Sequence, residues 1–564
     1  MSGQLAASGS ALTTDHVRPT SRQSAAGIPG RQKTAAVWAL GFVVLFLAYY
    51  RLSWTGMVNS DAASNIFQVQ DMLHGNVLLH GWWLSDVSFY TTELPQYALI
   101  EAVLGPVPAV IHVAAAMTYT LAILLAALVA KGRATGRAGA LRMVTAAGIM
   151  LAPQPGRGVF VLDLALGHIG TSVPLLLTWL LVDRAGNRRW VPAAVGVLLA
   201  WALVADPVVL YAGIAPLIIV CGVRAYRVIV IQRRAPATAR FEIALALAAL
   251  AAVPVASGTL ALIHALGGFT VYPIPPALVA GGAVPRHLSL TAESILTLFG
   301  ADFLGLSMGL NAAGAFVHLV GLALAACAVW LVIRRFARAT GHDGLAIEVM
   351  AVAVTVSITA FAFSSLSVDT TYAREIAVVL PFSAALAGRL LAGPLTSRRL
   401  LPALVAVLCG YVLTLAHGVV QPPQQTENQQ MAGWLAARHF RYGLGAYWQA
   451  TSVTLASGQQ VQVRPVAPAP RGTVGVDPWE SRASWYDPRM HDANFIVVDQ
   501  SHEYAHTAPY PQVLATFGTP DRTYKVGPYL VLVWHKNLLT DLPCGFVLDR
   551  PRQHLRPSAA RGCQ

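Results

Sequence analysis

Charged side chains are scarce in this sequence: they make up 12% of its 564 residues, whereas 55% of the residues are hydrophobic. An average soluble domain carries charge at about a quarter of its positions, so this balance excludes an ordinary soluble protein and indicates a polytopic membrane protein. The net charge of +13 comes mainly from short loops between apolar segments. Because no basic stripe with interleaved aromatic residues occurs, we expect the lipid bilayer, and no nucleic acid, as a partner.

Cysteines and metal-binding motifs are equally sparse. Cys221, Cys327 and Cys409 fall in or at apolar segments and are expected to behave as small apolar side chains. Cys544 and Cys563 lie in the part of the chain expected outside the cell, where disulfides persist, so we predict that they pair. The sequence has no DxD pair, and a divalent metal cofactor is left open.

Long apolar runs, in contrast, are abundant. A membrane helix needs roughly twenty such residues to cross the hydrocarbon core, and the sequence predicts about eleven spans. They lie at residues 35–57, 107–130, 139–155, 164–182, 190–205, 208–223, 241–264, 310–333, 345–363, 376–393 and 400–419. We therefore expect an all-α transmembrane module at residues 35–419, preceded by a disordered cytoplasmic tail at residues 1–34.

Basic loop residues predict the orientation of these spans, because cytoplasmic loops carry an excess of Arg and Lys. One set of alternate loops contains clusters such as Arg188 with Arg189, and the other contains only scattered cations such as Arg157. This pattern predicts a cytoplasmic N-terminus. We expect a multi-pass protein of the inner or plasma membrane, with the chain after residue 420 outside the cell.

The sequence changes character after residue 420. MAGWLAARHF has the composition of a helix, while VQVRPV, NFIVVD and YLVLVWH are β-branched or alternating runs typical of strands. We predict that residues 420–564 form a small extracytoplasmic α+β domain.

The predicted first outer loop, residues 51–106, contains a second kind of helix. Apolar residues recur on one helical face at positions 66–73, which predicts an amphipathic helix lying on the membrane surface. Asn59 or Ser60 is expected to cap this helix, and an acid in its first turn, such as Asp61, gains about 0.3–1 kcal/mol from the helix dipole.

Three short elements carry a family resemblance. They are NSDAASNIFQ beyond the first span, LPQY at residues 94–97, and an Arg-x6-Pro element from Arg374 to Pro381 in DTTYAREIAVVLPF. Together with the anchor span and the long first outer loop, they resemble the GT-C superfamily of membrane glycosyltransferases, which includes the protein O-mannosyltransferases and aminoarabinose transferases. The resemblance covers residues 35–395, mainly in topology.

The resemblance implies an inverting glycosyltransferase that works at the extracytoplasmic face. Members of the superfamily take their sugar from a polyprenyl-phosphate lipid, and the acceptor here would be an envelope glycan, lipid or protein. We expect Asp61 to be the catalytic base that removes the proton of the acceptor hydroxyl. The superfamily's Asp-Glu pair is replaced by Asp61 and Ala62, so this role rests on Asp61 alone.

Basic residues in the outer loops are candidates for binding the donor phosphate. Arg374 comes first, because a guanidinium can meet phosphate oxygens with two donors. Arg286 and His287 come second; they lie in a long outer loop at residues 265–309 that either closes over the donor or serves as a surface linker. Each of the three could instead contact lipid headgroups.

Three further side chains are candidates for supporting roles. Asp163 and His168, in VLDLALGHIG, could bind a metal or orient the acceptor, although an acid at the start of a span often caps a helix. Glu93 lies just before Pro95, where loop chemistry is an alternative. The competing function for the whole chain is a non-enzymatic one, as a lipid-linked-sugar flippase or an envelope-assembly scaffold.

Overall fold

The computed structural model describes residues 30–164, 168–272, 274, 277–338, 344–365, 367–395, 397–500 and 507–543. These residues are mostly helical, as the sequence predicts, with a mixed α/β region at the C-terminal end. The chain divides into two compact units, Met1–Val44 and Leu45–Gln564. Within the first unit the structure describes only the beginning of α1, and both sheets belong to the second unit.

The helical part of the chain ends near residue 420. Its helices are α1 (Gly30–Ser53), α2 (Ser60–Leu73), α3 (Glu93–Leu104), α4 (Ala109–Lys131), α5 (Gly136–Met150), α6 (Arg157–Val159), η1 (Phe160–Leu164), α7 (His168–Ala185), α8 (Val191–Ala205), η2 (Leu210–Ile214), α9 (Ala215–Tyr226), η3 (Arg227–Ile231), η4 (Pro236–Ala239), α10 (Arg240–Ala265), η5 (Gly281–Ala283), α11 (Val284–Leu298), α12 (Leu310–Arg338), α13 (Leu345–Phe363), η6 (Thr370–Ile376), α14 (Val379–Leu395) and α15 (Leu401–Val420). Two short strands, β1 (Trp82–Leu84) and β2 (Thr270–Val271), lie between them.

Seven helices among the described residues are long and apolar enough to cross a membrane. They are Ala36–Ser53, Ala109–Lys131, Leu210–Ile231, Pro236–Ala265, Leu310–Arg338, Leu345–Phe363 and Leu401–Val420. The number rises to nine if each of two bent pairs forms one span. These pairs are α6 and η1 with α7, bent by 54°, and η6 with α14, bent by 57°.

Two other predicted spans form helices that are short for a membrane. Residues 139–155 and 190–205 correspond to α5 and α8, each 15 residues long. At 1.5 Å per residue such a helix rises about 22 Å, less than the roughly 30 Å of an average hydrocarbon core. The structure therefore supports a multi-pass membrane protein with seven to nine candidate spans among its described residues, fewer than the eleven expected.

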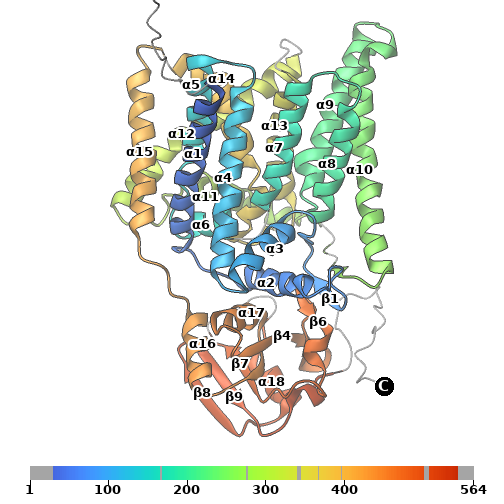
Figure 1. The fold of residues 1–564 in the computed structure, drawn as a ribbon, viewed down its shortest axis with the longest axis vertical. Coiled ribbons are helices and arrows are strands. Elements are labelled where there is room, and N and C mark those ends of the chain that lie inside the picture. The colour runs from blue at the N-terminus through green and yellow to red at the C-terminus, as the bar shows by residue number, and fades with distance from the viewer. Residues whose placement is uncertain are drawn as a thin grey trace, which may run out of the picture. The chain divides into compact units, whose positions relative to one another are not determined.

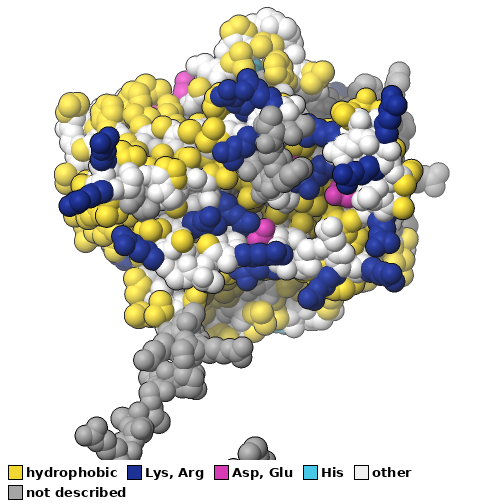
Figure 2. All heavy atoms as spheres, turned by 90° about the horizontal axis from the view of Figure 1, so that it is seen from above, with side chains coloured by type: hydrophobic (Ala, Val, Ile, Leu, Met, Phe, Trp, Pro, Cys, Tyr) yellow, Lys and Arg dark blue, Asp and Glu magenta, His cyan; other side chains and the backbone are white. Residues whose placement is uncertain are grey.

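Basic side chains gather at one end of the helices in the second unit. Figure 2 shows many Lys and Arg side chains on the face viewed from above in Figure 1, where α4 ends in Lys131 and α7 has Arg184 in its last turn. The C-terminal region lies at the opposite end of these helices (Figure 1). The alternate loops that the sequence marks as basic thus meet on one face, as expected for loops on one side of a bundle.

The C-terminal region consists of a mixed sheet with helices packed on it. Its elements are α16 (Glu427–Ala437), β3 (Tyr442–Gly445), α17 (Tyr447–Ala456), β4 (Gln462–Ala469), η7 (Pro470–Gly472), β5 (Thr473–Val476), β6 (Ser481–Arg482), η8 (Ala483–Tyr486), β7 (Phe495–Asp499), α18 (Tyr510–Phe517), β8 (Arg522–Val526), β9 (Tyr529–Val533) and η9 (Leu538–Thr540). Six strands pair in the order β5-β4-β3-β7-β9-β8, with β3 parallel to both β4 and β7. The predicted helix and three predicted strands are confirmed as α16, β4, β7 and β9.

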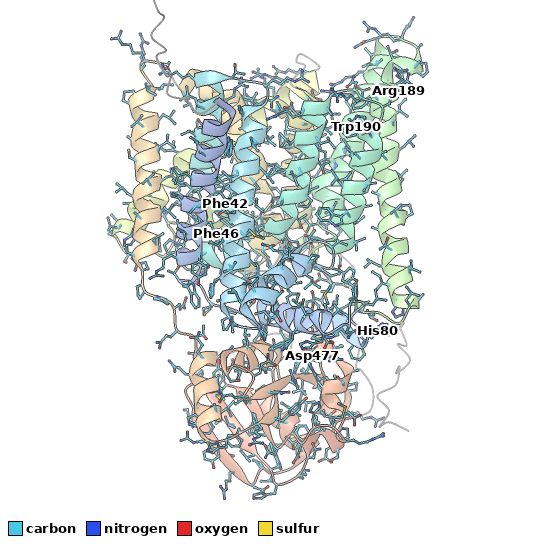
Figure 3. All side chains as sticks on the ribbon, viewed as in Figure 1. Phe42, Phe46, His80, Arg189, Trp190 and Asp477 are labelled. Carbon is cyan, nitrogen blue, oxygen red and sulfur yellow. The ribbon has the colours of Figure 1, made fainter. Side chains whose placement is uncertain are left out.

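A second, three-stranded sheet joins distant parts of the chain. Its order is β2-β1-β6, with β1 parallel to β2 and antiparallel to β6. It therefore links residues 51–106, the predicted first outer loop, to the 265–309 segment and to the C-terminal region. His80, which lies beside β1 in Figure 3, adds a contact of 2.7 Å between its ring nitrogen and the carbonyl of Gly267.

The helix α2 differs from the surface helix that the sequence predicts. Asn59 caps it as expected, accepting a hydrogen bond from the backbone N–H of Ala62 at 3.1 Å. However, every residue from Ser60 to Val69 is buried, because α3 and α4 pack against one side of the helix and α17 against another. The C-terminal region covers the opposite, polar face, where Ser60 and Ser64 contact Ser452 and Thr451 of α17. The apolar residues Ile66 and Val69 are also fully buried, so the apolar face that the sequence predicts toward lipid is covered by protein.

Candidate functional site

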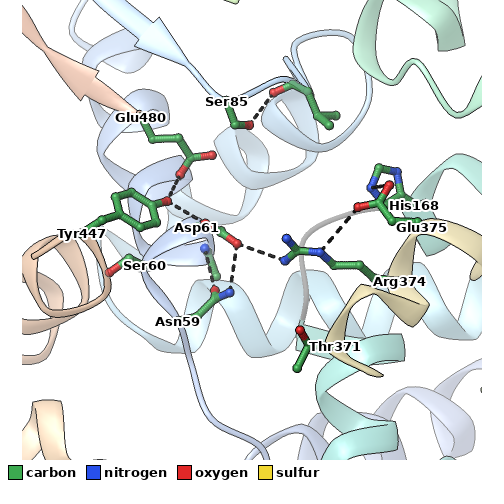
Figure 4. Close-up of polar contacts among 12 residues, drawn as sticks. Asn59, Ser60, Asp61, Ser85, His168, Thr371, Arg374, Glu375, Tyr447 and Glu480 are labelled. Atoms are coloured by element: carbon green, nitrogen blue, oxygen red, sulfur yellow. Dashed lines mark hydrogen bonds and ion pairs between the residues drawn. The ribbon is translucent and has the colours of Figure 1, made fainter. Parts of the chain in front are cut away.

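Asp61 lies in the first turn of the buried helix α2, and only 9% of its surface is exposed. Its Oδ2 accepts hydrogen bonds from the amide of Asn59 at 3.1 Å and from Nη1 of Arg374 at 3.2 Å (Figure 4). Its Oδ1 accepts a hydrogen bond from the hydroxyl of Tyr447 at 2.6 Å. Both carboxylate oxygens are thus held by partners that lie far apart in the sequence.

Arg374 reaches Asp61 because of the bend between η6 and α14. The two helices meet at 57°, and Arg374 lies near the end of η6, just before the bend. Its Nε lies 3.8 Å from the carboxylate of Glu375, and its guanidinium lies over the ring of Tyr372 at 5.7 Å. The structure therefore brings together the predicted base and the first candidate for phosphate binding.

A chain of ionisable side chains continues from Arg374 into the helices. Nε2 of His168 lies 3.1 Å from the carboxylate of Glu375, and its Nδ1 lies 2.8 Å from the carboxylate of Asp206. Asp206 also accepts hydrogen bonds from the hydroxyl of Thr171 and from the backbone N–H of Val208. Two acids therefore hold the ring of His168 from both sides and fix its orientation.

Tyr447 and Glu480 complete the site from the C-terminal region. The hydroxyl of Tyr447 lies 2.7 Å from Oε2 of Glu480 as well as 2.6 Å from Asp61. Burial first, and then the negative charge of Asp61, hold the pKa of Glu480 well above its ordinary value of 4.5. Burial likewise raises the pKa of the Tyr447 hydroxyl, so this side chain is a neutral hydrogen-bond donor.

Two more acids lie close to this row of ionisable side chains. Burial and the negative charge of Glu375 raise the pKa of Asp86 to about 6. Burial raises the pKa of Glu93 to about 7, and its carboxyl lies against Gly170 of α7, where any side chain larger than glycine would collide with it. Both carboxyl groups therefore hold their protons more tightly than an acid exposed to water.

Glu93 and Asp163 both line one small pocket between α3, α4, η1 and α7. Neither carboxylate oxygen of Asp163 has a hydrogen-bond partner among the described residues, and the same holds for Oε1 of Glu93. Asp163 lies within η1 and does not cap a helix. Glu93 and Asp163 make no contact with Asp61 among the described residues. His168, in contrast, is connected to Asp61 through Glu375 and Arg374.

The remaining sequence candidates lie elsewhere. His287 on α11 has a ring nitrogen 2.8 Å from the hydroxyl of Ser367, and α11 packs against η6. Arg286 is exposed on the same helix, and no contact with Asp61 or Arg374 is found for it among the described residues. The predicted pair Cys544 and Cys563 falls outside the described residues.

Sequence reasoning missed four members of the site. Asp206 precedes Pro207 and Glu375 follows Arg374 in the sequence, and no motif marks either residue, yet both hold His168. Tyr447 and Glu480, both in the C-terminal region, are marked by no motif either. The clusters form between segments more than 30 positions apart, and the only local signal was the charge of Asp206 and Glu375 beside apolar spans.

The described residues contain no group of three or more His, Cys, Asp or Glu side chains arranged to hold a metal ion. A divalent metal therefore stays an open prediction. In comparisons with known proteins, no family model and no curated protein sequence matches this chain.

Proposed function

We propose that this chain is an inverting glycosyltransferase that moves a sugar from a polyprenyl-phosphate donor to a cell-envelope acceptor at the extracytoplasmic face. The observation that carries the proposal is the 3.2 Å contact between Arg374 and Asp61, which lie 313 positions apart. A carboxylate can accept the proton of an attacking hydroxyl, and a guanidinium can stabilise a leaving phosphate. The pair thus supplies both groups that such a reaction needs.

The reaction would proceed as one displacement. The acceptor oxygen attacks the anomeric carbon while Oδ2 of Asp61 takes the hydroxyl proton. The bond between the anomeric carbon and the phosphate oxygen breaks, its electron pair stays on the phosphate, and Arg374 stabilises the added charge. Attack from the face opposite the leaving group inverts the anomeric carbon. The products are the glycosylated acceptor and polyprenyl phosphate.

Arg374 and Asp61 have to separate for this step. A base and a phosphate ligand on opposite sides of a reacting carbon lie about 9 Å apart when each makes an ordinary hydrogen bond. The 3.2 Å contact therefore fits a state without substrate. A phosphate offers Arg374 several acceptor oxygens, so the donor can replace Asp61 as its partner. The base would be released only when the donor is bound.

The proposal includes the membrane arrangement that the sequence predicts. A cytoplasmic N-terminus and an external C-terminal region put Asp61 on the side where polyprenyl-linked sugars are used. The basic side chains at the other end of the helices support this orientation (Figure 2), since cytoplasmic loops are rich in Arg and Lys. The short helices α5 and α8 would complete the eleven spans by crossing a locally thinned bilayer.

The decisive experiment replaces Asp61 in the purified full-length chain. Wild type and Asp61→Asn are given radiolabelled polyprenyl-phosphate sugars and a panel of envelope acceptors. We expect wild type to transfer label and the variant to lose roughly 10² to 10⁴ of the rate, the share that a positioned base contributes. Asp302→Asn is the matched control, because it removes an acid that pairs with Arg157 at 3.7 Å, outside the site.

Two results would overturn the proposal. One is transfer by Asp61→Asn at the wild-type rate, which would make the Arg374 contact a structural tie. The other is the absence of transfer by wild type from every donor tested, which would favour the flippase or scaffold alternative. Thermal unfolding of each variant shows whether a loss of rate reflects misfolding.

A further inference from the structure

The hydroxyl of Tyr447 presents a proton-counting problem. It lies 2.6 Å from Oδ1 of Asp61 and 2.7 Å from Oε2 of Glu480, but it has a single proton to donate. Tyr447 is fully buried, and Glu480 is 2% exposed. Both contacts can be hydrogen bonds only if one of the two acids carries a proton and donates it to the tyrosine oxygen.

The surroundings decide which acid carries that proton. Asp61 faces two further hydrogen-bond donors, the guanidinium of Arg374 and the amide of Asn59, which both donate to its Oδ2. Glu480 faces Asp61, Tyr447 and the hydroxyl groups of Ser85 and Ser64, and the burial of its side chain outweighs these hydrogen bonds. Arg482, two positions along the chain, is paired with Asp71 at 2.8 Å. A buried acid beside an anion and without a paired cation is most stable when neutral.

The backbone at Glu480 gives an independent sign that its position is constrained. Its φ angle is +48°, in the left-handed region that side chains other than glycine rarely adopt. Such a conformation costs about 1–3 kcal/mol and persists only where the surrounding structure holds it. The contacts of Glu480 are therefore maintained against a local preference for another conformation.

We propose that Tyr447 and Glu480 are a positioning pair in which neutral Glu480 donates to the Tyr447 oxygen and Tyr447 donates to Oδ1 of Asp61. The C-terminal region thereby fixes the rotation of the Asp61 carboxylate and leaves Oδ2 directed at Arg374. Where turnover is concerned this inference rests on the proposed function; the proton arrangement does not. It assigns Oδ2 as the oxygen that acts as base, because Oδ1 stays bonded to Tyr447.

Infrared spectroscopy of the purified full-length chain tests the proton arrangement without any substrate. The C=O stretch of a protonated carboxyl group that disappears in Glu480→Gln is assigned to Glu480. We expect this band to persist in wild type well above pH 4.5, the ordinary pKa of glutamic acid. In Asp61→Asn the midpoint of its titration should move to lower pH, because the variant removes a neighbouring negative charge.

The tyrosine is tested in the same measurement. Tyr447→Phe removes the acceptor of the Glu480 proton, so the frequency of the band should change. The matched control is Tyr442→Phe, which removes a buried hydroxyl that donates to the carbonyl of Trp485 at 2.6 Å and should leave the band in place. A wild-type spectrum without the Glu480 band at pH 7, or identical bands in the two tyrosine variants, would overturn the positioning pair.

Turnover separates this inference from the proposed function. If wild type transfers sugar, Glu480→Gln, which stays neutral and can still donate, should retain a kcat within a few-fold of wild type, whereas Glu480→Ala should lose kcat at least tenfold. Equal rates in these two variants would count against the pair. If wild type transfers no sugar but shows the Glu480 band, the proposed function fails and the proton arrangement stands.

Discussion

Arg389 of α14 holds Asp183 of α7 with two parallel hydrogen bonds, from Nη1 to Oδ2 at 3.0 Å and from Nη2 to Oδ1 at 2.9 Å. Nη1 also donates to the carbonyl of Val129 in α4 at 3.0 Å. One guanidinium therefore ties together three helices, at the end of the bundle opposite the C-terminal region. This two-point geometry is specific to arginine, because a lysine ammonium is a single point charge.

Arg389→Lys should consequently destabilise the protein although it keeps the charge. The loss of one charged hydrogen bond costs about 1.5–3 kcal/mol, and a shorter ammonium cannot serve both Asp183 and Val129. Thermal unfolding in detergent measures the effect. The control is Arg399→Lys, an exposed arginine between α14 and α15 that should leave the unfolding temperature unchanged. Equal unfolding temperatures for the two variants would contradict the tie.

Gly132, the residue after α4, should not tolerate a side chain, because the Arg389 guanidinium that joins the three helices lies beside it. Its φ angle is +55°, and a Cβ atom there would collide with the guanidinium of Arg389. We expect Gly132→Ala to lower stability by about 1–3 kcal/mol, the usual cost of strain and overpacking. Gly75→Ala, at a φ of +98° with open space around it, is the control that isolates backbone strain from the collision. The prediction fails if Gly132→Ala is no less stable than Gly75→Ala.

Glu93 should make the stability of the protein depend on pH. Its pKa is raised from 4.5 to about 7, so the folded state holds a proton that the unfolded state releases above pH 4.5. The stabilising effect is fully present below pH 4.5 and is lost as the pH rises to 7, by up to about 3 kcal/mol. Glu93→Gln should flatten the unfolding temperature between pH 5 and 7. The prediction fails if the unfolding temperature of Glu93→Gln changes with pH as steeply as that of wild type. It also fails if Glu293→Gln on α11 flattens the pH dependence equally.

Asp71 should control how firmly the C-terminal region is held. Its carboxylate accepts hydrogen bonds from Arg482 and from the indole of Trp82, both at 2.8 Å, and so joins α2, β1 and β6. We expect Asp71→Ala to be cleaved several-fold faster than wild type in limited proteolysis, because Arg482 loses its partner. Asp541→Ala, which breaks an exposed pair with Lys536, serves as the control. Cleavage of Asp71→Ala at the control rate would show that the ion pair does not hold the junction.

Local sequence signals predicted the elements of the fold well. Apolar runs marked each long helix, Asn59 marked the start of α2, and alternating β-branched residues marked β4, β7 and β9. The expected eleven spans exceed the seven to nine candidates because α5 and α8 are apolar but only 15 residues long. The burial of α2 could not be predicted, because an amphipathic helix looks the same whether it faces lipid or another part of the chain.

Only part of the candidate site could be predicted from the sequence. Asp61 and Arg374 were singled out through the resemblance to membrane glycosyltransferases, and the structure brings them into contact. Asp206 had a sufficient local explanation in its Asp-Pro step, so its pairing with His168 had no local signal. Glu480, just before β6, contacts Asp61 through Tyr447, and β6 pairs with β1, which is a tertiary relationship between distant segments.

The contact between Tyr447 and Asp61 spans 386 positions, and this has a consequence for biosynthesis. A chain grows from its N-terminus, so α2 emerges from the ribosome long before α17 and β6 exist. Until those late segments are translated, the acid on α2 has no hydroxyl to hold it. A nascent or prematurely terminated product therefore has an Asp61 carboxylate without its Tyr447 partner. The site can form only after the C-terminal region has been synthesised.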